Sequence, residues 1–475
     1  MRPSTRLRGE VGRVVARLAG VRLPLPVEIA AARAAGGLSR VLRRGGGTTV
    51  PGKLLWKVDP YAVDRLAARL SAGTVLVSAT NGKTTTAAMA AEILRPRFAL
   101  AHNSSGANLV SGIASTLVAA RRAELGLFEV DEGALPEVAQ RLQPRVVCLG
   151  NLFRDQLDRY GELELIADRW REAVRRLPQA RLVLNGDDPQ LGDIALRRGS
   201  TTVFGVDDPR CARPSLQHAA DSKHCVSCGT PYEYRAAYVG HLGDYRCPAC
   251  GHGRPPLDVA ARDIELHGLD GAVFTLAAPA GERRVRLTVP GLYNVYNALA
   301  AASLALALGT SLDATVAGLE RSSAAFGRFE RIDVGDRRLL MLLIKNPAGA
   351  NEAVRTLVDG TPPRLCVVAL NDAIADGRDV SWIWDVDFEP LLDGLERVVV
   401  SGDRAAELAL RFKYAGFDTA RIEVVPGLER ALDRGFELTP SGGELVVLPT
   451  YTAMLALREI VASRGHVRPY WERAA

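Results

Sequence analysis

The sequence contains few lysines, few aromatic residues and no long apolar run. Six lysines stand against 54 arginines among 475 residues, and aromatic residues make up 6% of the chain. No stretch approaches the roughly 18 uninterrupted apolar residues that a membrane-spanning helix needs, so we expect no transmembrane segment. The net charge of +6 is modest for this length. The excess of arginine therefore indicates a compositional bias rather than a nucleic-acid-binding surface.

The amino-terminal segment lacks the apolar core and the cleavage site of a signal peptide. Residues 1–44 carry ten arginines scattered among alanine, leucine and valine. We therefore predict a cytoplasmic protein. A basic segment of this kind suits either contact with an anionic membrane surface or a solvated or packed pair of arginine-rich helices, and the sequence leaves both open.

The seven cysteines are an odd number, which argues against a disulfide framework. Four of them form two C-x-x-C pairs separated by 18 residues, namely Cys225, Cys228, Cys247 and Cys250. This spacing predicts a zinc ribbon with four thiolate ligands, in which Gly229 and Gly251 allow the tight turn after each pair. Because four cysteines complete a tetrahedral shell, we predict a structural rather than a catalytic zinc site. Two disulfides are the alternative, which a cytoplasmic location disfavours.

Apolar strand-like segments alternate with helix-like segments along most of the chain. One series of predicted strands comprises residues 73–79, 125–131, 145–152 and 180–186, and a second comprises 364–372, 397–403, 421–427 and 443–451. Such alternation is typical of α/β folds with parallel sheets. We therefore predict three regions: an arginine-rich segment (1–50), a central α/β domain (51–330) with the zinc ribbon inserted at about 205–255, and a smaller Rossmann-like α/β domain (331–475).

Residues 78–86, with the sequence SATNGKTTT, resemble a phosphate-binding loop that lacks its first glycine. The P-loop pattern G-x-x-x-x-G-K-[ST] would place that glycine at Val77. The loop nevertheless lies where a predicted strand meets a predicted helix, which is the context of a phosphate site. Lys83 would pair with the β- and γ-phosphates, Thr84 would bind Mg²⁺, and backbone amides around Gly82 would face the anion. The sequence therefore predicts a nucleotide site.

The segment T-N-G-K-T-T-T after a strand resembles the ATP loop of the Mur ligases, the ATP-dependent amide ligases that build the peptidoglycan stem peptide. Further motifs of that family follow in the same order, within about residues 73–350: LFEVDEG (127–133), GNLFRDQLDRYGE (150–162), LVLNGDDP (182–189), GLYNVYNALAA (291–301) and FGRFERI (326–332). The resemblance implies a Mur ligase-like central P-loop domain that binds ATP and Mg²⁺.

These motif matches imply roles for particular residues. Glu129, at the end of a predicted strand, matches the glutamate that holds Mg²⁺ in the family. Asn297 would contact the base of the nucleotide, and Arg328 would reach its phosphates. The loop residues that we expect to bind the nucleotide are Thr80, Asn81, Gly82, Lys83, Thr84 and Thr85.

The sequence departs from the Mur ligase pattern in three ways. Gln156 replaces the histidine of the family's D-H-x-D-R-Y segment, and Arg171 stands where many Mur ligases have a carbamylated lysine. A second Mg²⁺ must therefore be held differently or not at all. Too few residues precede the loop for the family's UDP-binding domain, so we do not expect a sugar-nucleotide substrate.

Four features resemble the MurT family, the synthetase subunits of lipid II isoglutaminyl synthase. They are the short amino-terminal segment, the four-cysteine insert, LIKNPAGANE (343–352) and NDAIADGRDVSWIWDVDFE (371–389). The resemblance implies an enzyme that uses ATP to turn the α-carboxylate of D-glutamate in the lipid II stem peptide into an acyl phosphate, which ammonia converts to D-isoglutamine. It also implies a GatD-like glutamine amidotransferase partner and a location at the inner face of the plasma membrane.

The chain has no G-x-C-x-G nucleophile elbow, so we expect the glutaminase chemistry in another polypeptide. In the MurT resemblance, an aspartate of the SWIWD region completes the partner's Cys-His triad from across the interface. We favour Asp385, because Trp382 and Trp384 beside it suit an interface. Asp379 and Asp387 remain alternatives on the sequence alone.

Two other functions remain open on the sequence alone. One is a folylpolyglutamate-synthetase-like ligase acting on a soluble substrate, against which the ribbon and the SWIWD segment argue. The other is a non-enzymatic nucleotide-binding scaffold whose zinc ribbon contacts nucleic acid. That ribbon has few basic residues and several acidic neighbours, so we expect no nucleic-acid partner.

Overall fold

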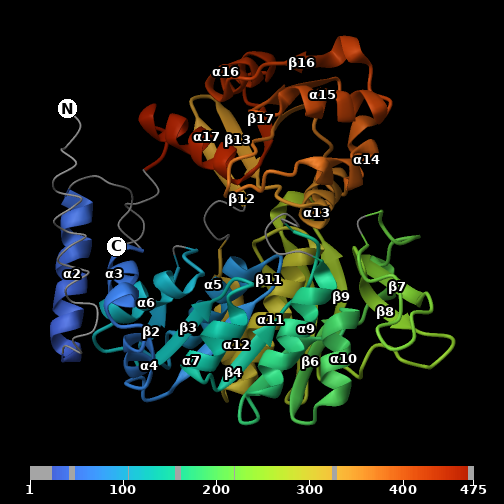
Figure 1. Cartoon of the computed structure of the whole chain (residues 1–475). Coiled ribbons are helices and arrows are strands. Elements are labelled where there is room, and N and C mark those ends of the chain that lie inside the picture. The colour runs from blue at the N-terminus through green and yellow to red at the C-terminus, as the bar shows by residue number, and fades with distance from the viewer. Residues whose placement is uncertain are drawn as a thin grey trace.

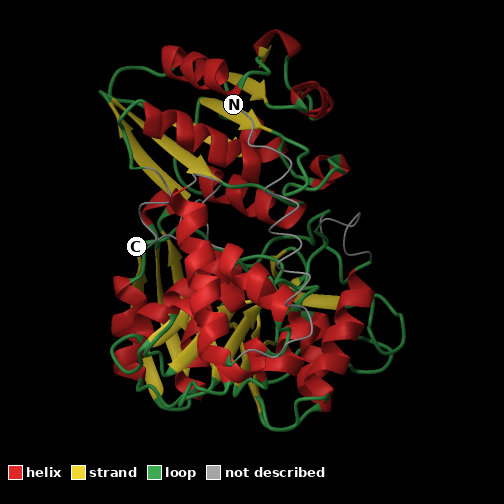
Figure 2. Ribbon diagram, turned by 60° about the vertical axis from the view of Figure 1, so that its left-hand side comes forward, coloured by secondary structure: helices red, strands yellow, loops and turns green. Residues whose placement is uncertain are grey.

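The computed structural model describes residues 24–41, 49–104, 106–155, 162–218, 220–323 and 329–468 of the chain. Within these residues, a larger part is built around a nine-stranded sheet and a smaller part around a six-stranded sheet. A two-stranded hairpin lies at one side of the larger part (Figure 1). Figure 2 shows helices packed over the strands of both parts. The predicted α/β fold class is therefore confirmed.

The sheet of the larger part has the strand order β11-β10-β9-β6-β5-β4-β1-β3-β2. Neighbours from β2 through β9 run parallel, whereas β10 runs antiparallel to both of its neighbours, β9 and β11. The strands are β1 (Thr74–Ser78), β2 (Leu100–His102), β3 (Leu125–Glu129), β4 (Val146–Leu149), β5 (Arg181–Asn185), β6 (Thr201–Val206), β9 (Val259–Leu266), β10 (Ala272–Ala278) and β11 (Gly281–Leu287).

Helices cover both faces of this sheet, which explains why β1, β3 and β4 are buried on every residue. Val75 and Val77 of β1 pack into one core with α5, α11 and α12, whereas Leu76 packs into a second core with the other helices. The helices are α2 (Leu25–Val41), α3 (Val50–Val58), α4 (Ala62–Ala67), α5 (Lys83–Leu94), α6 (Val110–Ala119), α7 (Leu135–Leu142), α9 (Leu163–Arg175), α10 (Pro189–Arg197), α11 (Leu292–Ala307) and α12 (Leu312–Arg321).

The hairpin of β7 (Glu233–Val239) and β8 (Leu242–Arg246) is inserted between β6 and β9. Since β6 and β9 are parallel neighbours in the sheet, the insert leaves the sheet and returns to the adjacent position. This is the segment in which the sequence predicts a zinc ribbon. The short 3-10 helices η1 (Pro209–Cys211) and η2 (Gly268–Asp270) lie before and after the hairpin in the chain.

The sheet of the smaller part has the order β12-β13-β17-β14-β15-β16, in which only β12 and β13 are antiparallel. The strands are β12 (Phe329–Val334), β13 (Arg337–Leu342), β14 (Leu365–Ala369), β15 (Arg397–Ser401), β16 (Ile422–Val424) and β17 (Glu444–Pro449). The helices are α13 (Pro347–Val358), η3 (Ser381–Asp385), α14 (Glu389–Leu392), α15 (Ala405–Tyr414), η4 (Thr419–Arg421), α16 (Leu428–Leu438) and α17 (Tyr451–Ser463). The four strands predicted here are all present.

The helices of the smaller part divide between the two faces of its sheet. Leu408 of α15 and Leu357 of α13 share a core, while Leu432 of α16 and Leu457 of α17 share another. α13 lies on the side that faces the larger part (Figure 1). Among the described residues, no helix is both long enough and apolar enough to span a membrane.

Candidate active site

The loop between β1 and α5 adopts a backbone conformation that requires a glycine at residue 82. Gly82 precedes the first residue of α5 with φ +86°, in the left-handed region that favours glycine. A Cβ atom there would lie 1.9 Å from Asn297 Oδ1, so any larger residue would displace at least the Asn297 side chain. Val77, at the position of the missing first glycine, lies inside β1 and is buried. The strand, loop and helix predicted around Lys83 are therefore present.

The segment that follows β4 fixes the backbone of this loop. Thr80 N donates to Asn151 O at 3.0 Å, and Phe153 N donates to the Thr80 hydroxyl at 3.0 Å. Asn81 N donates to Asn151 Oδ1 at 2.9 Å, while Asn151 Nδ2 donates to Asn81 O at 3.0 Å. These bonds hold Thr80 and Asn81 in a single conformation before any ligand arrives.

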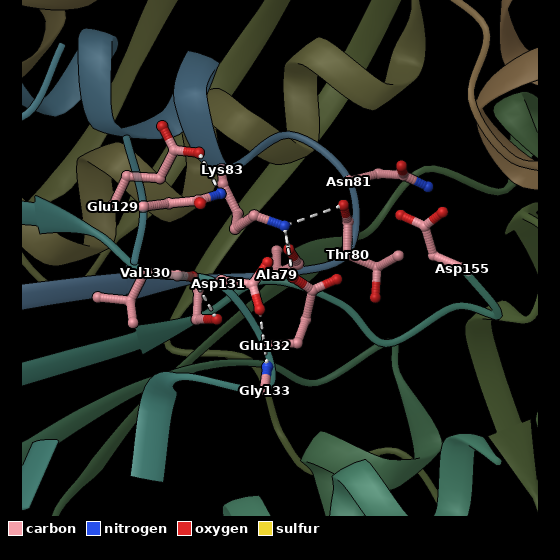
Figure 3. A network of polar contacts seen from close by, with 12 residues as sticks. Ala79, Thr80, Asn81, Lys83, Glu129, Val130, Asp131, Glu132, Gly133 and Asp155 are labelled. Carbon is pink, nitrogen blue, oxygen red and sulfur yellow. Dashed lines mark hydrogen bonds and ion pairs between the residues drawn. The ribbon is translucent and has the colours of Figure 1, made fainter. Parts of the chain in front are cut away.

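Lys83 is buried and folds back onto its own loop (Figure 3). Its Nζ lies 2.7 Å from Glu132 Oε2 and donates to the carbonyl oxygens of Ala79 and Thr80. Burial is the largest single influence and favours the neutral amine, but the attraction and hydrogen bond of Glu132, together with the attraction of Glu129 and Asp131, outweigh it and raise the pKa of Lys83. The side chain is therefore a charged ammonium at the loop, as a phosphate contact requires.

Glu132 is a site residue that the sequence analysis did not identify. It is buried, and although burial favours its neutral acid, Lys83 lowers the pKa of its carboxyl group. The two groups therefore form a buried ion pair. Glu132 belongs to the LFEVDEG motif and lies three residues after Glu129. A carboxylate just beyond the end of a parallel strand was the signal available in the sequence.

Glu129 and Asn297 border the same loop from different elements. Glu129 ends β3, is 2% exposed and pairs in register with Val77 of β1. Its Oε1 accepts a hydrogen bond from Asn108 Nδ2 at 3.4 Å. Asn297 lies in α11, where its Oδ1 accepts from the Thr86 hydroxyl at 3.3 Å. Figure 3 shows Glu129 beside Lys83.

The other predicted nucleotide contacts divide between described and undescribed residues. Thr84 and Thr85 lie in the first turn of α5, next to the loop. A small cavity behind the loop is lined by Ala79, Asn81 and Asn297, among others. Arg328, which the sequence places near the phosphates, lies outside the described residues, as does Gln156.

The two aspartates of the LVLNGDDP motif have structural contacts. Tyr296 of α11 donates from its hydroxyl to Asp187 Oδ2 at 2.6 Å, and Arg254 Nη1 lies 3.2 Å from Asp187 Oδ1. Burial raises the pKa of Asp187 to about 6 despite these partners. Asp188 Oδ1 accepts from Gln190 N at 2.9 Å and so caps α10. The motif therefore attaches α10 and α11 to the sheet.

The smaller part of the chain reaches the nucleotide loop directly. Lys345 Nζ donates to Thr80 O at 3.0 Å and to Asp155 Oδ2 at 2.5 Å. The side-chain amides of Asn81 and Asn346 exchange two hydrogen bonds, of 3.2 and 3.0 Å. Asn346 also caps α13, since its Oδ1 accepts from Gly349 N at 2.9 Å. Two distant segments therefore meet at one loop.

Asp385 lies at the surface where the two parts of the chain meet. Its Oδ2 is 3.3 Å from Arg154 Nη2, and its side chain is 40% exposed. Arg154 also pairs with Asp221. By contrast, Asp379 Oδ1 accepts from Ser381 N at 2.9 Å, within its own turn, and Asp387 Oδ1 lies 2.8 Å from His218 Nδ1.

Exposed aromatic side chains surround the η3 turn that ends at Asp385. Trp384 is 47% exposed and Tyr414 of α15 is 70% exposed, and their ring centroids are 5.8 Å apart. Arg411 fixes the backbone of this turn, because it donates to Ile383 O at 3.2 Å and to Val386 O at 2.6 Å. Trp382 is partly buried against the core of the smaller part.

The four cysteines of the inserted hairpin lie together. One sulfur atom from each lies within 4.8 Å of the others, with pairs at 3.6 Å and 3.4 Å. Zinc bound tetrahedrally at about 2.3 Å from each sulfur would separate the sulfurs by about 3.8 Å, so the donor set fits this metal. Gly229 and Gly251 have φ of +77° and +76°, as the predicted turns require. The residues are Cys225, Cys228, Cys247 and Cys250.

Comparison with known proteins supports the resemblance to the Mur ligases and to the MurT family. Two family models match the chain, Mur ligase middle domain at residues 77–243 and MurT ligase C-terminal at residues 343–454. A "Lipid II isoglutaminyl synthase (glutamine-hydrolyzing) subunit MurT" from Streptococcus pneumoniae (strain ATCC BAA-255 / R6) is 34% identical, covering 90% of this chain and 95% of the relative. A subunit of the same name from Staphylococcus aureus (strain N315) is 30% identical, covering 87% and 92%.

Solved structures show the same fold at lower sequence identity. A pseudomurein peptide ligase type C from Methanothermus fervidus has a TM-score of 0.67 at 22% identity, covering 84% of this chain and 80% of that one. The MurF ligase from Thermotoga maritima in complex with ADP has a TM-score of 0.63 at 15% identity, covering 88% and 85%. These likenesses concern the fold alone.

The fold and the nucleotide loop are those of a Mur ligase, an ATP-dependent amide ligase of peptidoglycan synthesis. This class uses ATP and Mg²⁺, and the loop, Lys83 and Glu129 are suited to both. Within the class, the chain belongs to the MurT family, since it aligns with a MurT subunit over 95% of that subunit's length.

Proposed function

We propose that the protein amidates the α-carboxylate of D-glutamate in the lipid II stem peptide, giving D-isoglutamine. ATP would activate the carboxylate as an acyl phosphate, and ammonia from a GatD-like glutaminase subunit would displace the phosphate. The observation that carries this proposal is the match to MurT subunits over nearly their whole length. Because lipid II is a membrane lipid, the reaction would take place at the inner face of the plasma membrane.

The nucleotide loop supplies the groups that this reaction needs. A carboxylate is a poor electrophile, and ATP supplies the phosphoryl group that makes it reactive. Lys83 and Arg328 would neutralise charge on the transferring phosphoryl group, while Thr84 and Glu129 would hold Mg²⁺. The charged state of Lys83 and the burial of Glu129 support these roles. Asn297 would face the base.

The ammonia would come from a partner that docks near η3. The sequence has no nucleophile elbow of its own, and Asp385 offers a partly exposed carboxylate beside the exposed Trp384 and Tyr414. Exposed aromatic side chains are common anchors of protein interfaces. We assign Asp385 as the residue that orients the histidine of the partner's Cys-His pair.

Reconstitution tests this function. The chain and its glutaminase partner, supplied with lipid II, ATP, Mg²⁺ and glutamine, should convert lipid II to its D-isoglutamine form, detected by mass spectrometry. Omission of ATP or the partner should stop glutamine-driven product formation, and free ammonia should replace the partner. Amino-acid addition to a soluble acceptor would favour a folylpolyglutamate-synthetase-like ligase instead. Salt-dependent binding of nucleic acid without amidation would favour a scaffold.

We also propose that the cysteine cluster holds a structural zinc ion. All four positions of a tetrahedral shell are filled by thiolates, so the ion would stabilise the hairpin and take no part in the reaction. Tyr232 and His252 join the two knuckles, with the Tyr232 hydroxyl 2.9 Å from His252 Nδ1. His252 Nε2 lies 3.5 Å from Asp193 of α10, which attaches the hairpin to the larger part.

Metal analysis of protein purified under reducing conditions should give about one zinc per chain. Cys228→Ser should lower the metal content and the unfolding midpoint, because one ligand is lost, while the affinity for ATP stays within about twofold. Ser227→Ala, in the same knuckle but outside the ligand set, is the control. Metal-free wild-type protein that remains fully folded would contradict this assignment.

Lys345→Met should weaken ATP binding by about tenfold, or about 1.4 kcal/mol. The substitution removes the donor that bonds Thr80 O and Asp155, and so frees one side of the nucleotide loop. The measurement is the KM for ATP in the reconstituted reaction. Lys413→Met, at an exposed site on α15, is the matched control. A KM unchanged by Lys345→Met would mean that the contact does not support the nucleotide site.

A further inference from the structure

Glu352 is a buried carboxylate that no described residue contacts by a hydrogen bond. It lies in the middle of α13 and is 2% exposed, yet neither Oε1 nor Oε2 accepts a hydrogen bond from the described residues. Buried polar groups in native proteins are nearly always bonded, and a buried charge without a partner is strongly unfavourable. A carboxyl group in this position is neutralised by a bound proton or by a cationic ligand that brings its own hydrogen-bond donors.

α13 connects the nucleotide loop with the segment that carries Asp385. At its beginning, Asn346 bonds Asn81 of the loop. Farther along, Asn351 Oδ1 accepts from Asp387 N at 2.7 Å, two residues after Asp385. Glu352 lies six residues beyond Asn346, which is about 9 Å along the helix axis. It therefore lies one residue beyond the contact with Asp387, on the helix that connects the nucleotide loop with the proposed docking region of the glutaminase.

The face of α13 that carries Glu352 is turned toward the larger part of the chain. Ala348, one turn earlier, is a member of the core formed by α5 and α11. Arg355, one turn later, donates to Tyr238 O at 3.0 Å and to Cys211 O at 3.2 Å. The carboxylate is consequently enclosed between the two parts and shielded from solvent.

The charged groups near Glu352 do not neutralise it by direct contact. Arg355 pairs with Asp359 at 3.2 Å, and Arg213 acts only at longer range; neither forms an ion pair with Glu352. Burial is the largest influence and raises the pKa of Glu352, with the two arginines lowering it and Asp359 raising it further. Among the described residues, no cationic side chain is in direct contact with the two acceptor oxygens of Glu352.

We propose that Glu352 is a binding site for ammonium in transit from the glutaminase to the acyl phosphate, an inference that rests on the proposed function. Ammonium bound to a carboxylate and ammonia bound to a carboxylic acid differ only in the position of one proton. The proton passes from nitrogen to Oε of Glu352, and neutral ammonia, the nucleophile, leaves. The proton remains on Glu352 and protonates the next neutral ammonia molecule that arrives from the glutaminase, so no proton is gained or lost over one cycle. A water-poor interface favours the neutral pair.

Thermal unfolding in different salts tests the site without turnover. In the complex with the partner, ammonium chloride should raise the unfolding midpoint above that in sodium or potassium chloride at equal ionic strength. Glu352→Gln should remove this difference, and Asp359→Asn, which removes a carboxylate one to two turns away on the same helix, should keep it. Equal midpoints in all three salts, or the same rise with potassium, would overturn the assignment.

Kinetics give a second and independent test. Glu352→Gln should raise the KM for ammonia by about tenfold or more, with kcat at saturating ammonia and the KM for ATP within about twofold. With glutamine as the nitrogen source, more glutamine should be hydrolysed per amide formed. Glu352→Asp, which keeps the charge, should be intermediate and serves if the glutamine variant does not fold. An unchanged KM for ammonia would overturn the proposal.

The two tests separate this proposal from the function on which it rests. If the wild-type complex makes no amide from glutamine or ammonia, the proposed function fails, and the thermal comparison still decides whether Glu352 binds ammonium. If the wild type makes amide and the Glu352 variants behave like wild type in both tests, only the ammonium site fails.

Discussion

We expect Lys83→Ala to reduce the proposed ATP-dependent amidation of lipid II by about a thousandfold or more. Lys83 is the cation of the loop, and its ammonium is charged in this structure. Removing one preorganised donor from a transition-state charge typically costs about 100- to 1000-fold, and Lys83 contributes a full charge as well. The measurement is the rate of D-isoglutamine formation by the reconstituted complex, with zinc content and partner binding unchanged.

Stability has to be separated from catalysis in this experiment. Lys83→Ala leaves the Glu132 carboxylate buried without its partner, and breaking a buried pair costs about 3–5 kcal/mol. The double variant Lys83→Ala/Glu132→Gln removes that unpaired charge. It should therefore recover most of the unfolding free energy and none of the activity. Near-normal amidation by either folded variant would refute the phosphate role of Lys83.

We expect Asp385→Asn to stop amidation with glutamine and to spare amidation with ammonia. The loss of an orienting carboxylate costs about 10⁴-fold where it has been measured in a catalytic triad. In the proposed function, phosphoryl transfer would depend instead on Lys83, Glu129 and Arg328, which precede the smaller part in the sequence. Free ammonia supplied at high pH should consequently restore amidation by the Asp385→Asn complex.

Two variants and one binding assay make this result specific. Asp379→Asn and Asp387→Asn test the alternatives, whose carboxylates are engaged with Ser381 and His218. A pull-down shows whether each variant still assembles with the partner. Normal glutamine hydrolysis by the Asp385→Asn complex would transfer the triad role to another aspartate. If ammonia fails to rescue an assembled variant, the pairing of Asp385 with Arg154 serves closure of the synthetase instead.

Local sequence patterns predicted much of this fold. The strand predicted before the nucleotide loop is β1. Every residue of β1 is buried, as expected for a strand covered on both faces of the sheet. The two C-x-x-C pairs came together because glycines after each pair permit the tight turns. The helix predicted at residues 84–95 is α5, one residue earlier at each end. The strand, the helix and each C-x-x-C turn are encoded within short stretches of consecutive residues.

Features that depend on distant partners were not predicted. β2 has only three residues, and β12 buries little more than Ile332, so neither gives a clear periodic signal. Lys345 and Asp155 are 190 positions apart, and neither local sequence indicates that the two side chains are in contact. The same holds for Arg154 with Asp385. Such contacts arise only when the two parts of the chain pack together.

The most direct test of the proposed acyl phosphate is whether an oxygen atom of the D-glutamate α-carboxylate is transferred to the released phosphate. Lipid II labelled with ¹⁸O in the α-carboxylate of D-glutamate is amidated by the complex with unlabelled ATP, and the released phosphate is analysed by mass spectrometry. An acyl phosphate requires the attacking carboxylate oxygen to leave with the phosphoryl group, so we expect ¹⁸O in phosphate in equal amount to the amide formed. Amidation that leaves the phosphate unlabelled would contradict activation through an acyl phosphate.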